Sequence, residues 1–73
     1  MTKSDRTAKT DITKVGKRGP FNVYAYRYLT DAIGTLRVGY MAQEVAKLVP
    51  EAVGRIGEHL ALDYSKLPEI EHA

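Results

Sequence analysis

The sequence predicts a small α+β fold, in which an antiparallel sheet of about three strands packs with one main helix. Residues 22–29 alternate three tyrosines with a second set of largely apolar residues, as an extended strand does. Residues 60–64 alternate in the same way nearer the C-terminus. Between them, residues 41–49 carry apolar side chains at helical spacing. These three observations decide the fold class.

Residues 1–11 show no regular hydrophobic period, and residues 16–20, Gly-Lys-Arg-Gly-Pro, are a turn signal. We therefore expect the ordered core to begin after that turn. The strand at 22–29 has something to bury on both faces. The polar residues 30–35 predict a hairpin loop that leads into a second strand at 36–40, paired antiparallel with the first.

The helix begins near Met41, and Pro50 ends it because the residue before a proline is pushed out of the helical region. Its apolar stripe is formed by Met41, Ala42, Val45, Leu48 and Val49. Residues 54–57 predict another turn before the third strand, and Ser65–Leu67 add one helical turn. The chain is predicted to be a single domain, 1–73, with an N-terminal segment at 1–20, a globular core at 21–67 and a frayed tail at 68–73.

Composition excludes several classes of protein. The chain has 73 residues, 44% hydrophobic and 27% charged, and its apolar runs are shorter than the ~20 residues of a membrane helix. It has no cysteine and only two histidines, His59 and His72, so we expect neither disulfides, nor a metal site, nor a cofactor. Neither histidine has a spacing suggestive of catalysis. The N-terminus lacks the apolar stretch of a secretion signal, so a cytoplasmic origin is the default expectation.

Positive charge is concentrated at the front of a chain whose net charge is only +2. Such asymmetry can mark a nucleic-acid contact. The sequence shows no helix-turn-helix pattern, zinc-finger spacing or arginine-rich run, however, and a solvated basic segment is the ordinary interpretation. Nucleic-acid binding is therefore the weaker alternative, and we expect neither a nucleic-acid nor a membrane partner.

Four segments resemble one family, in the family's order. Residues 4–9, Ser-Asp-Arg-Thr-Ala-Lys, are similar to the Ser-Asp-Arg-x-x-Lys opening of the intramolecular-chaperone auto-processing domains of phage endosialidases, tailspikes and tail fibres. Residues 23–28 resemble the aromatic strand of those domains. The most specific match is 38–53, with its Ala-Gln-Glu-Val helix and Pro-Glu-Ala-Val exit. Residues 60–67 resemble the last strand and turn.

The resemblance implies a function and a set of site residues. Members of this family help the preceding tail fibre, tailspike or endosialidase region to trimerise, and then cut themselves off. Carried over by position, Ser4 is the nucleophile, Lys9 is the general base, and the bond that is cut joins Lys3 to Ser4. Possible supporting residues are Asp5, Arg6, Gln43 and Glu44. The implied partners are further copies of the chain, as a homotrimer, and the upstream fibre region. The implied location is the cytoplasm of a bacterial host during phage or prophage assembly, or the virion.

The chemistry sets a requirement on Lys9. An ordinary lysine has a pKa of ~10.4, so at pH 7 fewer than about one molecule in a thousand is neutral and able to take the serine proton. Desolvation and nearby cations lower a lysine pKa, and Lys3 and Arg6 are candidate cations. A shift of ~3 units costs ~4 kcal/mol, which is large for so small a domain. We therefore expect the burial of Lys9 to need a subunit interface.

Other interpretations of the same residues stay open at this stage. Ser4 and Asp5 can cap a short helical turn, and Lys9 can be a surface cation. The tyrosines at 24, 26 and 28 and the stripe from Met41 are interpreted as core. The whole chain can also be a non-catalytic oligomerisation or interaction module with a vestigial cleavage motif.

The two ends of the sequence also bear on the resemblance. Three residues precede Ser4, so cleavage of this chain releases a tripeptide. Either the sequence is a fragment of a longer fibre or a free-standing gene has kept the module for another purpose. Family members usually continue into a helix that forms a trimeric coiled coil, and we expect a weaker trimer without it.

Overall fold

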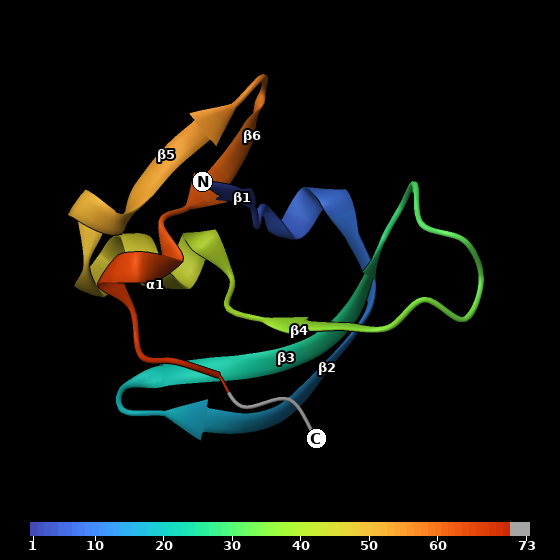
Figure 1. Cartoon of the computed structure of the whole chain (residues 1–73), viewed down its shortest axis with the longest axis horizontal. Coiled ribbons are helices and arrows are strands. Elements are labelled where there is room, and N and C mark those ends of the chain that lie inside the picture. Colours follow the sequence, from blue (N-terminus) through green and yellow to red (C-terminus); the bar gives the residue numbers. More distant parts are fainter. Residues whose placement is uncertain (71–73) are drawn as a thin grey trace.

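The fold consists of two three-stranded antiparallel sheets and one α-helix, in a computed structural model that describes residues 1–70 (Figure 1). One sheet has the strand order β2-β3-β4 and the other has the order β1-β6-β5. The strands are β1 Thr2–Lys3, β2 Lys9–Arg18, β3 Phe21–Tyr28, β4 Arg37–Gly39, β5 Val53–Ile56 and β6 His59–Leu62, and the helix is α1 Ala42–Leu48. Single 3-10 turns are η1 Arg6–Ala8, η2 Pro50–Ala52 and η3 Tyr64–Lys66. The predicted α+β class is confirmed.

The long hairpin of β2 and β3 corrects the prediction that order begins after residue 20. β2 pairs with β3 from Lys9 to Arg18, and the turn is confined to Gly19 and Pro20. The register shifts twice along β2, and Asp11 has a φ of +53°. Such bulges break the two-residue alternation by which a strand is recognised in a sequence. Half of the β2 residues are exposed and only Lys9 is buried, so burial does not impose an apolar pattern on the strand.

The predicted strand, loop, strand and helix at 22–49 are confirmed. β3 and β4 pair antiparallel, with Tyr24 opposite Gly39. α1 ends at Leu48, and the next residue, Val49, leaves the helical region before Pro50. Within residues 1–70, no helix is both long and apolar enough to cross a membrane.

The second sheet holds the chain's N-terminus against its C-terminal hairpin. The turn predicted at 54–57 is wrong in its bounds: Gly54 and Arg55 belong to β5, and the turn lies at Gly57 and Glu58. Only Gly57 there has a positive φ, +61°. The predicted third strand is β6, but it pairs with β5 and β1 and not with the β3–β4 sheet.

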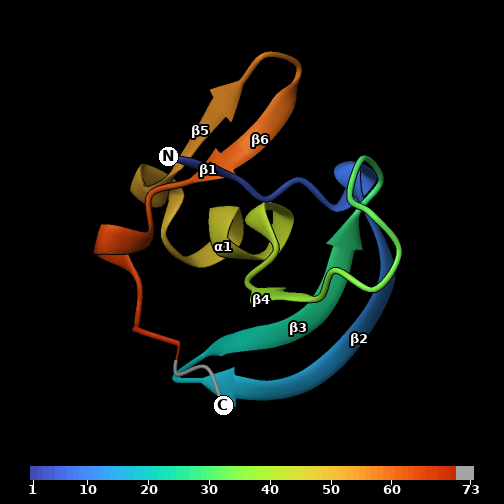
Figure 2. The same ribbon diagram turned by 45° about the vertical axis from the view of Figure 1, so that its right-hand side comes forward.

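The core lies where α1 and the two sheets meet, and Figures 1 and 2 both show α1 between the sheets. The aromatic residues at its centre stack edge to face and face to face. Tyr40 lies 5.5 Å from Phe21 and 5.7 Å from Tyr64, measured between ring centres. The buried cluster is formed by Phe21, Val23, Tyr40, Ala42, Val45, Ala52 and Leu62. The stripe predicted from Met41 is therefore partly core, as expected.

The beginning of the predicted tail is anchored. The Tyr40 hydroxyl donates a 2.6 Å hydrogen bond to the Pro68 carbonyl, and Ile70 packs against the buried cluster. The prediction of a frayed tail is therefore wrong for residues 68–70. Residues 71–73, which include His72, lie outside the described part of the chain.

Gly39 is required by the close approach of two tyrosines. A Cβ atom at this position would lie 2.5 Å from the Tyr64 hydroxyl and 3.1 Å from the Tyr26 hydroxyl. Because both side chains are packed, we expect Gly39→Ala to lower the free energy of unfolding by about 1–3 kcal/mol in urea denaturation. Gly16→Ala in β2 is the control, since a Cβ there meets nothing within 4 Å. Equal stability of the two variants would contradict this view of Gly39.

Candidate catalytic site

Ser4 lies where β1 leaves the sheet. Its amide still donates to the Leu60 carbonyl of β6, at 3.0 Å, but its own carbonyl turns away and accepts from the amide of Ala42, the first residue of α1, at 3.0 Å. The Ser4 side chain is fully buried, and its hydroxyl donates to the Tyr40 carbonyl. The serine is therefore fixed between the second sheet and the start of the helix.

The single turn η1 changes the direction of the chain after Asp5 and brings the side chain of Lys9 next to Ser4. Its amine lies 2.7 Å from Ser4 Oγ and 3.0 Å from the Tyr40 carbonyl oxygen. Met41 Sδ, at 3.6 Å, and the Tyr26 ring, whose centre is 3.9 Å from the amine, complete its surroundings. Lys9 is only 6% exposed, so the interpretation as a surface cation is wrong.

The surroundings of Lys9 lower the pKa of its amine to about 7. Desolvation by burial is the main cause, the positive charge of Arg6 adds to it, and Asp5 opposes both. Arg6 is thus one of the two cations predicted for this role, whereas Lys3 is not among the causes. The expectation that only a subunit interface could bury Lys9 is also wrong, because one chain buries it.

Asp5 fixes the turn between the two residues. Its carboxylate accepts hydrogen bonds from the Leu60 amide at 2.9 Å, from the Thr7 amide and hydroxyl at 2.9 and 2.7 Å, and from Gln43 Nε2 at 2.8 Å. These bonds, led by that of Leu60, hold the Asp5 pKa well below its usual range. Asp5, and not Ser4, is the cap of η1.

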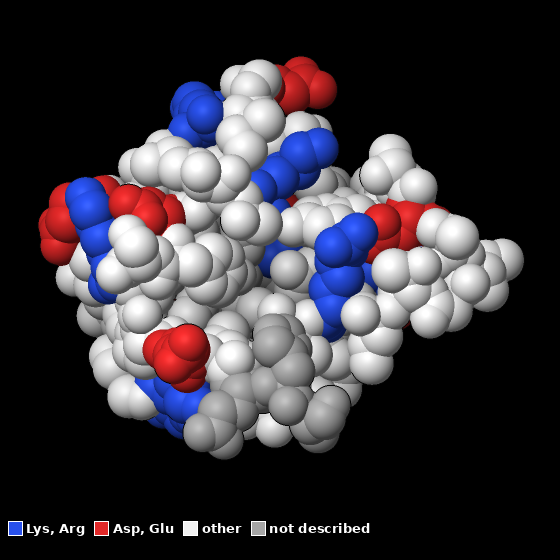
Figure 3. Space-filling view, viewed as in Figure 1, with Lys and Arg blue, Asp and Glu red and all other residues white. Residues whose placement is uncertain are grey.

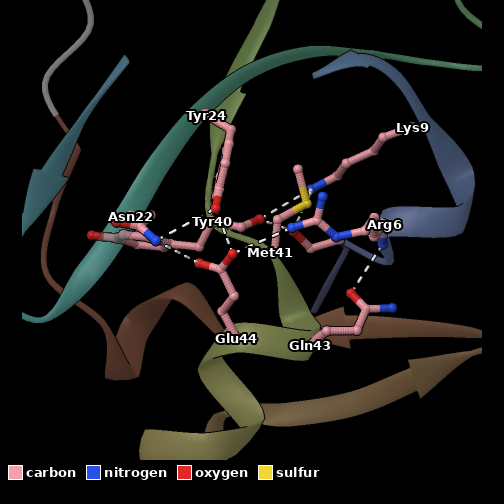
Figure 4. Close-up of polar contacts among 9 residues, drawn as sticks. Arg6, Lys9, Asn22, Tyr24, Tyr40, Met41, Gln43 and Glu44 are labelled. Carbon is pink, nitrogen blue, oxygen red and sulfur yellow. Dashed lines mark hydrogen bonds and ion pairs between the residues drawn. The ribbon is translucent and has the colours of Figure 1, made fainter. Parts of the chain in front are cut away.

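The remaining predicted supporting residues form a polar network between α1 and η1 (Figure 4). Gln43 Oε1 accepts from the Arg6 amide at 3.0 Å, while the same side chain donates to Asp5. Glu44 lies 3.3 Å from the Arg6 guanidinium and accepts from Tyr24 and Asn22. The network holds the Arg6 side chain in place, and the positive charge of Arg6 helps to lower the pKa of Lys9.

The structure adds contacts that the sequence did not reveal. The Tyr40 carbonyl and Met41 Sδ join the site from the segment before α1, and Tyr26 lies against the Lys9 amine. The Lys3 carbonyl accepts a hydrogen bond from the Tyr28 hydroxyl. The interpretation of these aromatic residues as core alone was therefore incomplete. Contacts made by a backbone carbonyl or by the face of an aromatic ring correspond to no sequence motif, so they could not be predicted from the sequence.

The described residues contain no group of three or more His, Asp or Glu side chains arranged to hold a metal ion. His59 Nδ1 is buried without a hydrogen-bond partner and lies 3.9 Å from the Asp5 carboxylate.

Comparison with known families gives one match. A family model described as chaperone of endosialidase, and named as a peptidase family, matches residues 4–54, well over half of the chain. The chain belongs to this family. The predicted family is thus confirmed, and the match begins at Ser4 and includes Lys9, Gln43 and Glu44. No curated protein and no solved structure matches the chain.

Proposed function

We propose that this chaperone-of-endosialidase domain assists trimerisation of an upstream tail fibre or tailspike region and then releases itself by cutting the bond between Lys3 and Ser4. The observation that carries the proposal is the 2.7 Å contact between Ser4 Oγ and the Lys9 amine, whose pKa is about 7. Nucleophilic serines are activated by a base at such a distance. The client is a phage or prophage protein assembled in the bacterial cytoplasm.

The first chemical step is an acyl shift within the chain. Neutral Lys9 takes the proton of Ser4 Oγ while this oxygen attacks the carbonyl carbon of Lys3. The tetrahedral intermediate collapses as the bond from the Lys3 carbon to the Ser4 nitrogen breaks and the Lys9 ammonium returns the proton to that nitrogen. Lys3 is then joined to Ser4 Oγ by an ester bond.

Water completes the reaction. It attacks the ester carbon with Lys9 again as base, Ser4 Oγ leaves and regains its proton, and Lys3 ends as a carboxylate. Each molecule reacts once, because the cleaved bond lies in the chain itself. The hydrogen bond from the Ser4 nitrogen to the Leu60 carbonyl supports this route, since it fixes the leaving nitrogen on β6.

The assembly part of the proposal is supported by the family and by one exposed loop. Residues 29–36 connect β3 to β4 and extend away from the body of the domain (Figure 1). Three of the large exposed apolar side chains lie in or next to this loop, at 65%, 96% and 70% exposure for Leu29, Ile33 and Leu36. Large apolar side chains left exposed on one loop are candidates for contact with another chain.

Nucleic-acid binding is not proposed. On the face shown in Figure 3, the Lys and Arg side chains of the described residues stand apart, with acidic or uncharged surface between them. Arg27 and Arg37 are paired with Asp11 and Asp31. Phosphate binding relies on basic side chains that act together.

The test of cleavage is the intact mass of the domain fused behind a longer upstream segment, followed over hours. We expect a new N-terminus at Ser4 and a rate that rises with pH through a midpoint near 7, because only neutral Lys9 is a base. At pH 5.5 the rate should lie ~30-fold below its plateau, as one group with that pKa requires. A fusion that stays intact at every pH would refute self-cleavage.

The test of assembly is sedimentation of a fibre region expressed with and without the domain. We expect a trimer in its presence and monomers or aggregates in its absence. A trimer from a fusion that never cleaves would identify the non-catalytic oligomerisation module instead. Monomers in both cases would refute the chaperone role.

A further inference from the structure

The carbonyl of Lys3 points away from its own sheet. In an antiparallel pair, hydrogen-bonded and non-hydrogen-bonded residue pairs alternate. The bond from the Ser4 amide to the Leu60 carbonyl makes that pair a bonded one, so the preceding pair, Lys3 and Ala61, is of the non-bonded kind. The Lys3 carbonyl oxygen is therefore free to face the other sheet.

Tyr28, at the end of β3, meets this carbonyl from the other sheet, and its hydroxyl donates to the Lys3 oxygen. The tyrosine is fixed on several sides. Its ring packs edge to face on Tyr26, with ring centres 5.4 Å apart, and the Arg37 guanidinium lies 5.0 Å from its centre. Its amide donates to Asp31 at 3.0 Å, which anchors the backbone where β3 ends.

We propose that Tyr28 is a catalytic residue whose hydroxyl stabilises the oxyanion formed on the Lys3 carbonyl oxygen during cleavage. This inference rests on the proposed self-cleavage before Ser4. Attack by Ser4 Oγ moves an electron pair of the carbonyl double bond onto that oxygen, and the hydrogen bond from Tyr28 then has an anionic acceptor. Collapse of the intermediate restores the double bond, and Tyr28 keeps its proton throughout.

The placement favours the transition state because the donor is already in position before the reaction. Hydrogen bonds to charged acceptors are about twice as strong as those between neutral groups, so this bond strengthens as charge develops. A fixed donor needs no reorganisation at that moment. The three groups required are thus supplied by three segments: Ser4 after β1, Lys9 at the start of β2 and Tyr28 at the end of β3.

The experiment compares Tyr28→Phe with the wild-type fusion by intact mass, across pH 5.5–8.5. Loss of one oxyanion donor typically slows a reaction by about 100- to 1,000-fold, and we expect a plateau rate reduced by that factor. The pH midpoint should stay near 7, because Tyr28 is not among the groups that shift the Lys9 pKa. Ser65→Ala, which removes a hydroxyl bonded to Asp63 instead, is the control and should cleave at the wild-type rate.

Thermal unfolding of the same samples separates a catalytic role from a structural one. A slow Tyr28→Phe variant with a melting temperature close to wild type supports the inference. Cleavage of this variant at the wild-type rate refutes the inference alone, and a slow variant with a displaced pH midpoint or a much lower melting temperature refutes it in favour of a structural role. A wild-type fusion that stays intact refutes self-cleavage itself and this inference with it.

Discussion

A fusion carrying Ser4→Ala is expected to stay intact, with cleavage slowed at least ~10,000-fold. The loss of a nucleophile from a base-activated pair reduces rates by this order. Besides Ser4 Oγ, the Lys9 amine is hydrogen-bonded to the Tyr40 carbonyl and Met41 Sδ and lies against the Tyr26 ring, and none of these can form an ester. Ser4→Ala keeps the backbone bonds to Leu60 and Ala42, so the fold should persist.

Ser4→Cys is the matched variant for this test. A thiol keeps the nucleophile, and its pKa of ~8.5 makes it easier to activate than a hydroxyl. We expect Ser4→Cys to cleave at the same bond at a measurable rate, read by intact mass and by the new N-terminus. Cleavage of Ser4→Ala between Lys3 and residue 4 would show that another group attacks, and the proposed dyad would be wrong.

The parts of the fold that could be predicted are those where burial imposes a period. β3 has three tyrosines on one face and the buried Phe21 and Val23 on the other, and α1 has an apolar stripe that ends before Pro50. β2 could not be predicted because it is a bulged strand with one buried residue, and its shape comes from pairing with β3. β5 was not predicted because it contains Gly54. Glycine in a sequence indicates a turn, but in the structure Gly54 is part of the strand.

The site also has a part that could be predicted from the sequence and a part that could not. Ser4 and Lys9 stand in one short motif, and the resemblance named them. Their surroundings depend on distant backbone positions, since the Tyr40 carbonyl lies 36 residues from Ser4 in sequence and its direction is set only once α1 packs on the second sheet. The prediction for Lys9 failed for a related reason. The cost of lowering its pKa suggested that so small a domain could not bury it alone, but Met41, Tyr26 and η1 enclose it within one chain.

Lys9→Met is expected to have two opposite effects, a loss of cleavage and a gain in stability. Methionine is unbranched and apolar, and it fits a site already lined by Met41 and Tyr26. Without the amine nothing removes the Ser4 proton, so cleavage should fall by ~10,000-fold, as for Ser4→Ala. The gain in stability follows from the pKa of Lys9, which burial lowers from 10.5 to about 7 in the folded chain.

The direction of the pH effect follows from where the proton is bound. Below pH 7 Lys9 is charged in both folded and unfolded chains, and the folded state bears the full cost of burying the charge, on the order of 5 kcal/mol. Between pH 7 and 10.5 the unfolded chain binds the proton and the folded chain does not. Stability therefore rises with pH in this range, by up to about 1.4 kcal/mol per pH unit.

The measurement compares Ser4→Ala with the double variant Ser4→Ala and Lys9→Met, so that neither protein cleaves during denaturation. From urea unfolding at pH 6–9, we expect the double variant to be more stable at pH 6 and its advantage to shrink by about 2–3 kcal/mol by pH 9. Parallel curves would mean that Lys9 has an ordinary pKa and cannot be the base. Stability curves that converge as pH rises would show that the burial of Lys9, which makes it a base, also destabilises the domain. The buried lysine would then lower stability in favour of the reaction.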